Sequence, residues 1–502
     1  MHSLYIKIHP EDNVGIAIKT IKENTYIEEG LTSKNIIPQG HKIALEDIEK
    51  GFPIKRYGVI LGYAISSIEK GSWINEHMLE LPPPPSLDNM AFGLAKPRKL
   101  IKPERTTFLG YLNKDGSAGT RNLLGISTTV QCVSSVLDVA VDKIRKELLP
   151  KYPFVDDVLA INHAYGCGVA INAPDAIIPI RSLQNFVHHP NFGGEVMVIA
   201  LGCEKLTIDR LLCENDIKET NVITLQEVDG FTKMLDEIMS MADKKLQVLN
   251  QRRRVPVPVE KLVIGAQCGG SDAFSGVTGN PAMGYASDLI VSLGGTVMFS
   301  EVTEVRDGVH IIAERCVSQD VVNKLASEMR WYDEYLARGS VDRSANPTPG
   351  NKKGGLSNIV EKAMGSIAKS GTQPIVEVLS AGELPTKKGL IFAATPASDF
   401  VCGASQLASG ITLQVFITGR GTTYGLAAVP VVKVSTRDEL KMAWNDLIDI
   451  SAGKIATGEK TVEEVGLEFY NFILDVASGK QTFAEIHGLK NFMTFFNPAP
   501  IT

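Results

Sequence analysis

The sequence predicts an α/β protein of several domains, with an all-β module first, then a central α/β domain and a C-terminal domain built on a parallel sheet. Three observations predict this architecture: the length of 502 residues, alternating apolar residues near the start, and apolar runs interleaved with helical patterns later on. At about 100 to 200 residues per domain, the length corresponds to roughly three domains. Hydrophobic residues make up 44% and charged residues 22%, which excludes disordered and fibrous classes.

The first domain is predicted over residues 1–78. Apolar residues alternate at 4–8 and again at 14–18, and the turn sequence PEDN at 10–13 separates them, which is the pattern of a β-hairpin. Prolines are frequent in the following segment, 79–105. Such a composition favours an extended, semi-rigid linker.

The central domain is predicted at 106–250 and the C-terminal domain at 258–502. Apolar residues at helical spacing predict two central helices, from Val133 to Leu148 and from Phe231 to Ile238. The segment 251–260, QRRRVPVPVE, is interpreted as a second connector. The apolar runs after it predict buried strands at KLVIGA, GTVMFS, PIVEVL, GLIFAA, TLQVFI and VPVVKV. Strands that are apolar on both faces indicate a parallel sheet covered by helices.

Charge and cysteine usage limit the partners and the compartment. The formal net charge of -6 gives no basic surface for nucleic acid, so a site for an acidic molecule must be built from a few local cations. No apolar run is long enough to span a membrane, and the N-terminus lacks the pattern of a signal peptide. The seven cysteines are odd in number, widely spread and without a CxxC pair, which predicts a reducing cytoplasm rather than a disulfide framework.

Polar side chains follow the predicted strands, where ligands gather in open α/β sheets. A single cysteine is more often a small buried hydrophobe than a ligand, but together these residues would form one polar cluster if their strands are neighbours. They are His163 and Cys167 after DVLAI, Cys203 after VMVIAL, Cys268, Ser271 and Asp272 after LVIGA, Glu301 and Arg306 after TVMFS, Cys402 after LIFAA, and Arg420 after QVFIT.

Common catalytic signatures are missing from the sequence. There is no GxSxG, HExxH or GxxxxGK[ST], and GRGTTYG has the wrong spacing for a dinucleotide loop. The remaining interpretation is metal-assisted chemistry on a small polar molecule. Mixed Cys, His and carboxylate donors suit iron or another borderline metal better than calcium or magnesium. Arg121, Arg306 and Arg420 are the planar cations best suited to bind carboxylates.

Long motifs spread over the whole chain resemble the altronate/galactarate dehydratase family. They include GYLNKDGSAGTRNLLGI, NHAYGCGVAINAP, NFGGEVMVIALGCEKL, QCGGSDAFSGVTGNPAMGYASDL, SEVTEVRD and TPASDFVCG. The N-terminal stretch IPQGHKIALEDIEKGFPIKRYGVILGYA resembles the SAF, or β-clip, module of that family. The stretches RSANPTPGNKKGGL and FNPAPIT are similar to its galactarate branch.

The resemblance implies a hydro-lyase that converts galactarate to 5-dehydro-4-deoxy-D-glucarate and water, with iron(II) as the metal. Another divalent cation can take the same site in a crystal. The family picture also implies a β-clip domain, a central dimer-forming domain and a C-terminal Rossmann-like domain. We therefore expect a cytoplasmic homodimer that acts on a dicarboxylic sugar acid and binds neither nucleic acid nor membrane.

This chemistry suggests roles for the singled-out residues. Removing a proton α to a carboxylate creates an enediolate, which a metal and cations must stabilise, while Lys or His serves as the base. We expect His41 or Lys42 to complete the site by folding over the C-terminal domain, unless GHK is an exposed turn; His163 is a further catalytic candidate. The metal ligands are expected among His163, Cys167, Cys268, Asp272, Glu301 and Cys402. Arg121 and Arg420 are expected to hold the two substrate carboxylates, with Arg306 and Ser271 as further substrate contacts.

Three alternatives stay open at this point. An iron–sulfur cluster of the aconitase kind would use Cys167, Cys203, Cys268 or Cys402, although their spacing fits no ferredoxin pattern. An altronate-type dehydratase would need one carboxylate contact rather than two. A non-catalytic sugar-acid binding protein would bind galactarate without removing water, but binding alone gives no reason for so many cysteines and carboxylates after strands.

Overall fold

The N-terminal module consists of short antiparallel strands. The computed structural model describes residues 4–218, 221–490 and 493–501. The predicted hairpin is present, with Ile6 opposite Ile16. In the described residues, the module forms sheets of order β1-β2-β5-β8, β6-β7-β9 and β3-β4. Its strands are β1 Tyr5–Ile6, β2 Val14–Ala17, β3 Tyr26–Glu28, β4 Leu31–Thr32, β5 Lys42–Ala44, β6 Pro53–Arg56, β7 Val59–Ala64, β8 Trp73–Ile74 and β9 Leu79–Glu80.

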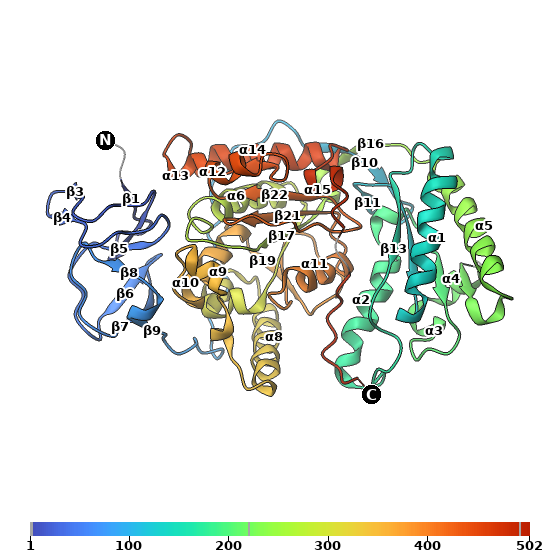
Figure 1. Ribbon diagram of the computed structural model, residues 1–502, viewed down its shortest axis with the longest axis horizontal. Helices are drawn as coiled ribbons and strands as arrows, with labels where there is room; N and C mark the ends of the chain where they lie inside the picture. The colour runs from blue at the N-terminus through green and yellow to red at the C-terminus, as the bar shows by residue number, and fades with distance from the viewer. Residues whose placement is uncertain (1–3, 219–220, 491–492, 502) are drawn as a thin grey trace.

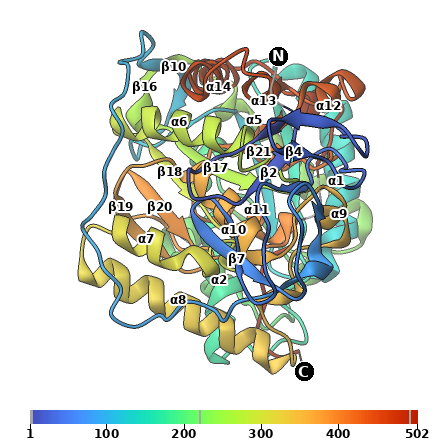
Figure 2. The same ribbon diagram turned by 90° about the vertical axis from the view of Figure 1, so that its left-hand side faces the viewer.

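The proline-rich segment after β9 runs in extended form along the C-terminal domain (Figure 2). Two buried arginines of that domain hold it through its carbonyl groups. Arg343 donates to the Pro82 carbonyl at 2.7 Å, and Arg306 donates to the Pro85 carbonyl at 2.9 Å. Proline carbonyls remain free to accept because the prolyl ring removes only the N–H donor. These hydrogen bonds therefore fix the segment to the surface of the C-terminal domain.

The segment predicted as a second connector is a strand. Val255–Pro258 forms β16, which pairs antiparallel with β10 Thr107–Leu112 in a sheet that also contains β11 Ala118–Gly119. Pro256 and Pro258 are tolerated there because β16 is an edge strand, where missing N–H donors break no central ladder. This small sheet joins the two α/β domains.

The middle domain has a parallel sheet of order β13-β12-β14-β15. Its strands are β12 Leu123–Thr128, β13 Asp157–Ile161, β14 Val198–Ala200 and β15 Val222–Thr224. Both predicted helices are present, and the buried Leu137, Ala140, Val141 and Ile144 form the core-facing stripe of the first. The helices are α1 Ser134–Glu147, α2 Ile177–Val187, α3 Ile208–Leu211, α4 Glu214–Lys218 and α5 Phe231–Leu249.

The C-terminal domain contains a parallel sheet of order β19-β20-β18-β17-β21-β22-β23 within the described residues, as the apolar runs predicted. Its strands are β17 Val263–Cys268, β18 Thr296–Phe299, β19 Ile375–Leu379, β20 Leu390–Ala393, β21 Leu413–Thr418, β22 Val431–Ser435 and β23 Ile450–Ser451. The helices are α6 Gly279–Ser292, α7 Val309–Arg315, α8 Gln319–Arg338, α9 Pro349–Lys353, α10 Ile359–Ile367, α11 Asp399–Ala408, α12 Asp438–Ala443, α13 Gly453–Ala456, α14 Val462–Ala477 and α15 Phe483–Ile486.

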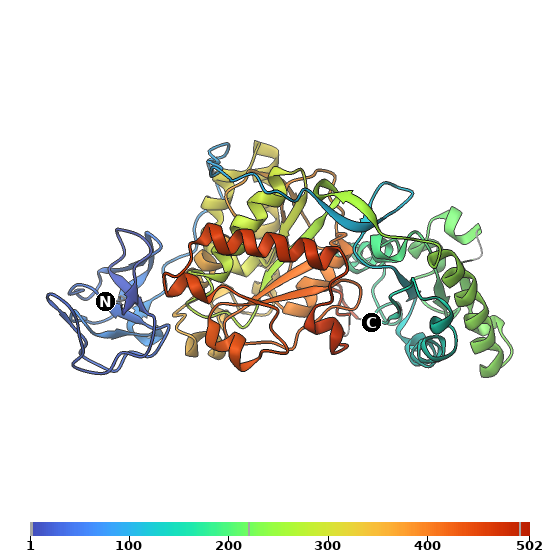
Figure 3. The ribbon, with the colours of Figure 1, turned by 90° about the horizontal axis from the view of Figure 1, so that it is seen from above.

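The order of the domains in space differs from their order in the chain. The C-terminal domain lies in the centre, with the β module at one end of the molecule and the middle domain at the other (Figures 1 and 3). The β module therefore packs against a domain whose residues lie hundreds of positions away in the sequence. None of the described helices has both the length and the apolar character that crossing a membrane requires.

Candidate active site

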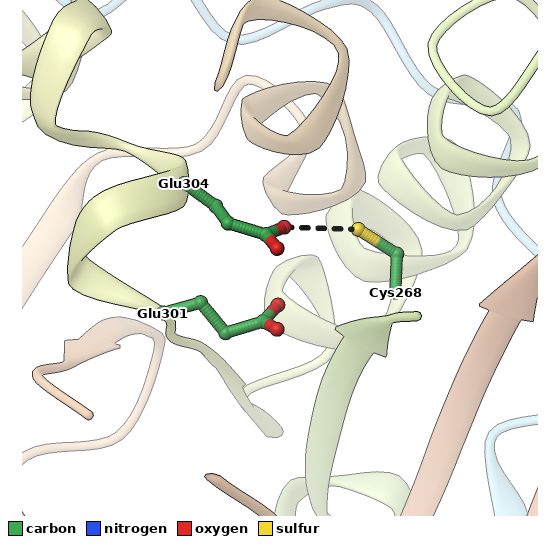
Figure 4. Close-up of side chains that lie close together, drawn as sticks. All are labelled: Cys268, Glu301 and Glu304. Atoms are coloured by element: carbon green, nitrogen blue, oxygen red, sulfur yellow. Dashed lines mark hydrogen bonds between the residues drawn. The ribbon is translucent and has the colours of Figure 1, made fainter. Parts of the chain in front are cut away.

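Three side chains with metal-binding atoms meet at the carboxyl ends of β17 and β18 (Figure 4). Cys268 is the last residue of β17, and Glu301 and Glu304 lie in the turn that follows β18. One ligand atom from each lies within 4.8 Å of the others, and all three residues are buried. We refer to Cys268, Glu301 and Glu304 as the acidic triad.

Two buried lysines balance the charge of the acidic triad. The Lys369 ammonium lies 3.1 Å from Glu301 Oε2 and 3.3 Å from Cys268 Sγ, and Lys362 Nζ lies 2.6 Å from Glu304 Oε1. Burial alone would lower the pKa of Lys369, but its anionic neighbours outweigh burial and raise that pKa above its usual value. For Lys362, too, the anionic neighbours outweigh burial and raise the pKa above its usual value. Both lysines therefore carry fixed positive charge.

Glu301 is the strained member of the triad. Its backbone φ is 77°, a left-handed conformation that non-glycine residues rarely adopt outside functional sites. Burial, with the nearby Glu304 carboxylate, raises the pKa of Glu301 to about 8, although Lys369 opposes the shift. Its Oε1 is buried and has no hydrogen-bond partner among the residues that the structure describes. Such an atom can carry a proton or bind a cation, and the donor set of one thiol and two carboxylates suits a borderline metal such as iron(II).

The β module reaches this region through a buried ion network. Lys42 Nζ lies 2.8 Å from Glu361 Oε2 and donates to the Gly355 carbonyl at 2.7 Å, while Arg56 also pairs with Glu361. Burial would raise the pKa of Glu361, but the two cations overcome it and lower the pKa to about 2. Glu361 precedes Lys362 on α10, so the network connects β5 and β6 to the acidic triad.

His41 also packs on the C-terminal domain. The Trp73 indole N–H donates to its Nδ1 at 3.1 Å, so the opposite nitrogen, Nε2, carries the proton and donates to the Lys353 carbonyl at 3.3 Å. Burial lowers the pKa of His41, consistent with a neutral ring. The GHK sequence is therefore not an exposed turn but is folded over the C-terminal domain, against the segment that contains α9.

The remaining candidates of the C-terminal domain lie around the acidic triad without joining it. Asp272 pairs with Arg437 at 3.3 Å, and Ser271 lies beside it with a buried hydroxyl that has no hydrogen-bond partner. Arg420 is exposed, and Cys402 is buried in α11. Arg306 holds Asp333 at 2.9 Å and the linker carbonyl, so its guanidinium has structural partners.

The single polar cluster that the sequence suggested divides into two. β13 and β14 belong to the middle sheet, whereas β17, β18, β20 and β21 belong to the C-terminal sheet. His163 and Cys167 therefore lie in a different domain from the acidic triad.

Arg121 also has a structural environment. It binds both oxygens of Glu485, at 2.6 and 2.8 Å, and donates to the carbonyls of Thr120, Val476 and Lys480. Arg121 is thus held in a structural ion pair with Glu485.

Sequence reasoning missed the cations that complete the site. Lys362 and Lys369 come from α10 and the turn after it, and Arg56 comes from the end of β6. A search limited to residues that follow strands passes over them. The available signal was IVEKAMGSIAKS, a short and mostly apolar segment whose charged residues are buried along with the rest of the helix.

Comparison with known proteins supports the architecture over the whole chain. Three family models match: the altronate/galactarate dehydratase SAF domain at residues 3–82, the second domain of D-galactarate dehydratase/altronate hydrolase at 110–250, and the C-terminal domain of D-galactarate/altronate dehydratase at 259–499. The chain is 57% identical to galactarate dehydratase (L-threo-forming) of Escherichia coli K12, covering 100% of this chain and 98% of the relative. The chain belongs to the altronate/galactarate dehydratase family. As a member of this family it is a hydro-lyase.

More distant relatives also match this chain. Altronate dehydratase of Bacillus subtilis 168 is 32% identical over 98% of both chains. The beta subunit of (2R)-sulfolactate sulfo-lyase from Chromohalobacter salexigens is 28% identical over 77% of this chain. Within this dehydratase the acidic triad lies in the matched C-terminal domain, and Lys42 and Arg56 lie in the matched SAF domain.

Proposed function

We propose that this hydro-lyase is a galactarate dehydratase, which removes water from galactarate to give 5-dehydro-4-deoxy-D-glucarate. The observation that carries the proposal is the acidic triad with its two lysines, buried in the domain that matches the dehydratase C-terminal model. The similarity to a galactarate dehydratase over the full chain supports the choice of substrate.

The residues around the triad fit the demands of this elimination. Loss of the proton α to a carboxylate places negative charge on the enediolate, and the fixed charges of Lys362 and Lys369 are suited to stabilise it. Without a bound cation, Glu301 holds a proton at neutral pH because its pKa is raised to about 8, and a metal would bind in place of that proton. His41 and Lys42 are the proposed bases, because burial lowers the pKa of both. To act as a base, His41 must first release the Trp73 N–H and Lys42 must release the Glu361 carboxylate.

We also propose iron(II) as the metal, held by Cys268, Glu301 and Glu304. The support is the mixed donor set and the unpartnered Oε1 of Glu301. When bound there, the metal supplies Lewis-acid stabilisation of the enediolate. A cavity of about 180 Å³ is bordered by Val302, the residue after Glu301, and by Thr395. Arg420, which has no ion pair within the described residues, remains the proposed contact for one substrate carboxylate.

Turnover measurements test the proposal. Anaerobic protein with added iron(II) and a reductant is offered galactarate, glucarate and altronate, and the keto product is followed. We expect galactarate to be the preferred substrate, and Glu301→Gln and Lys369→Met to lower turnover at least about 10²-fold. Glu439→Gln, at an exposed helical position, serves as the control. Preference for altronate would indicate the altronate-type activity, and galactarate binding without product would indicate a binding protein.

The cellular setting is part of the same proposal. Seven free cysteines, four of them exposed, suit a reducing cytoplasm. A homodimer formed through the middle domain follows from the family resemblance. The mass in solution, measured by light scattering, tests it: a monomeric mass at working concentration would contradict the dimer.

A further inference from the structure

Three cysteines gather at one edge of the middle domain, away from the acidic triad. Cys132 follows β12, Cys167 follows β13, and Cys203 follows β14. These strands are parallel neighbours in the order β13-β12-β14, so their carboxyl ends lie side by side. All three thiols are exposed, whereas free cysteines are among the most often buried residues.

Each pair of the three loops that carry these cysteines is joined by a hydrogen bond. The Gln131 N–H donates to the Tyr165 carbonyl at 3.2 Å, which links the first loop to the second. The Lys205 N–H donates to the Gly166 carbonyl at 2.9 Å, which links the third loop to the second. The Thr129 hydroxyl donates to Glu204, which links the first loop to the third. The loops therefore form one closed unit that holds the cysteines at a shared edge.

The middle loop approaches its neighbour too closely for a side chain. Gly166 has a φ of +101°, and a Cβ there would lie 2.1 Å from the Thr129 carbonyl oxygen. Only glycine accommodates both the backbone conformation and this contact. The close approach brings the Cys167 loop against the segment that leads into Cys132. Near Cys167, the buried Tyr165 hydroxyl has no hydrogen-bond partner within the described part of the chain.

The other potential ligands nearby already have partners. His163 Nε2 donates to the Thr128 carbonyl at 2.8 Å, and its Nδ1 accepts the Tyr165 N–H at 3.2 Å. The Glu204 carboxylate accepts from the backbone N–H groups of Leu201 and Gly202 as well as from Thr129. Three thiols without a fourth protein ligand do not make a structural zinc site, which uses four.

The start of α1 adds a favourable electrostatic environment. Cys132 lies in the turn just before this helix of 14 residues. The positive end of the helix dipole favours negative charge at this position. Thiolates bound to a metal cluster would place such charge there.

We propose that Cys132, Cys167 and Cys203 bind an iron–sulfur cluster of the [4Fe–4S] type, with one iron that has no protein ligand. Soft thiolate donors select such clusters, and three of them leave one corner open to a small molecule. The cysteines of the aconitase-type alternative thus separate: Cys167 and Cys203 join Cys132, while Cys268 and Cys402 belong to the other domain. This site is independent of the acidic triad.

Chemical analysis of the full chain tests the cluster. The protein is purified anaerobically, reconstituted with iron(II) and sulfide, desalted, and assayed for iron, acid-labile sulfide and the electron paramagnetic resonance of the reduced cluster. We expect bound sulfide in the native protein and its loss in each of Cys132→Ser, Cys167→Ser and Cys203→Ser. Cys213→Ser removes another exposed thiol of the same domain, and Cys268→Ser removes the thiol of the acidic triad; both should retain the sulfide.

The outcomes separate this inference from the proposed function, because the readout is sulfide rather than turnover. Metal bound without sulfide, sulfide retained in any of the three variants, or a disulfide between two of these cysteines would overturn the cluster. Circular dichroism of each variant checks its fold. Because the three cysteines are exposed, a serine at any of them should leave the melting curve of the cluster-free protein unchanged, so loss of sulfide reports on binding.

Discussion

The two α/β domains use the same edge of a parallel sheet in opposite ways. In the C-terminal domain, the carboxyl ends of the strands carry ionisable groups that are buried, and lysines neutralise them. In the middle domain, the corresponding ends carry three thiols that are exposed. The first edge is closed over by α10 and the β module, whereas the second faces solvent.

This difference shows what burial demands of a polar site. A charge removed from water is costly unless another charge and hydrogen bonds compensate it. The acidic triad therefore requires Lys362 and Lys369, and their helix in turn contacts Lys42 and Arg56 of a distant domain through Glu361. Exposed thiols need no such compensation, so the middle domain can build its cysteine edge from local loops alone.

The largest expected effect tests the closed edge. Glu361→Gln leaves Lys42 and Arg56 as buried cations without a counter-charge, and we expect the contact between the β module and the C-terminal domain to weaken by about 3 to 5 kcal/mol. Hydrogen exchange of β5 and β6 amides should accelerate accordingly. The matched control is Glu69→Gln, which removes the exposed pair with Lys34 at 3.2 Å and should change stability by less than about 0.5 kcal/mol.

A second variant shows whether unpaired buried charge is what weakens the contact between the β module and the C-terminal domain. Glu361→Leu combined with Lys42→Met removes one cation together with the anion, so it should recover part of the protection lost in Glu361→Gln. Equal exchange rates in Glu361→Gln and the native protein would mean that the network contributes nothing to holding the module.

The next largest effect is the loss of stability of the middle domain at acidic pH. His163 and His189 have the same environment: Nδ1 accepts a backbone N–H, and Nε2 donates to a carbonyl oxygen. Burial lowers the pKa of each to about 4. Because the unfolded chain binds protons first, stability should be full above about pH 6.5 and fall as the pH drops towards 4, by about 1.4 kcal/mol per pH unit for each histidine.

Urea unfolding of the native protein and of His189→Asn between pH 7 and pH 4 measures this dependence. Asparagine retains an acceptor at the N-cap but takes up no proton, so the variant should be less stable at pH 7 and less sensitive to acid. His77→Asn, at a side chain that is 86% exposed, should leave the slope unchanged. An unchanged slope in His189→Asn would show that this ring does not titrate between folded and unfolded states.

Most of the fold could be predicted from local pattern, and the exceptions have physical causes. Strands that are apolar on both faces identify a parallel sheet because both faces are covered. The edge strand Val255–Pro258 was not recognised, because the prolines and charged residues of 251–260 are typical of a connector. Its pairing partner, β10, lies far away in the sequence. Pairing of that kind depends on tertiary contact rather than on local preference.

The site was less predictable because it depends on which strands are neighbours. Residues after strands were found, but the sequence did not show that they belong to two sheets. Cys268 and Glu301 lie together because β17 and β18 pair, while Cys167 lies in another domain. The helix-borne Lys362 and Lys369 follow no strand, and buried lysines are recognised only once their carboxylate partners are located.

The smallest expected effect concerns the exposed cysteines of the middle domain. In metal-free, reduced protein, Cys132→Ser should change the free energy of unfolding by less than about 0.5 kcal/mol, because the side chain is exposed. Mass spectrometry after brief alkylation should find label on Cys132, Cys167 and Cys203 but not on Cys316, where burial raises the pKa of the thiol to about 12. Cys316 should react only as the protein unfolds. If Cys316 were labelled as fast as Cys132 in native conditions, the C-terminal domain would be opening far more often than its packing allows.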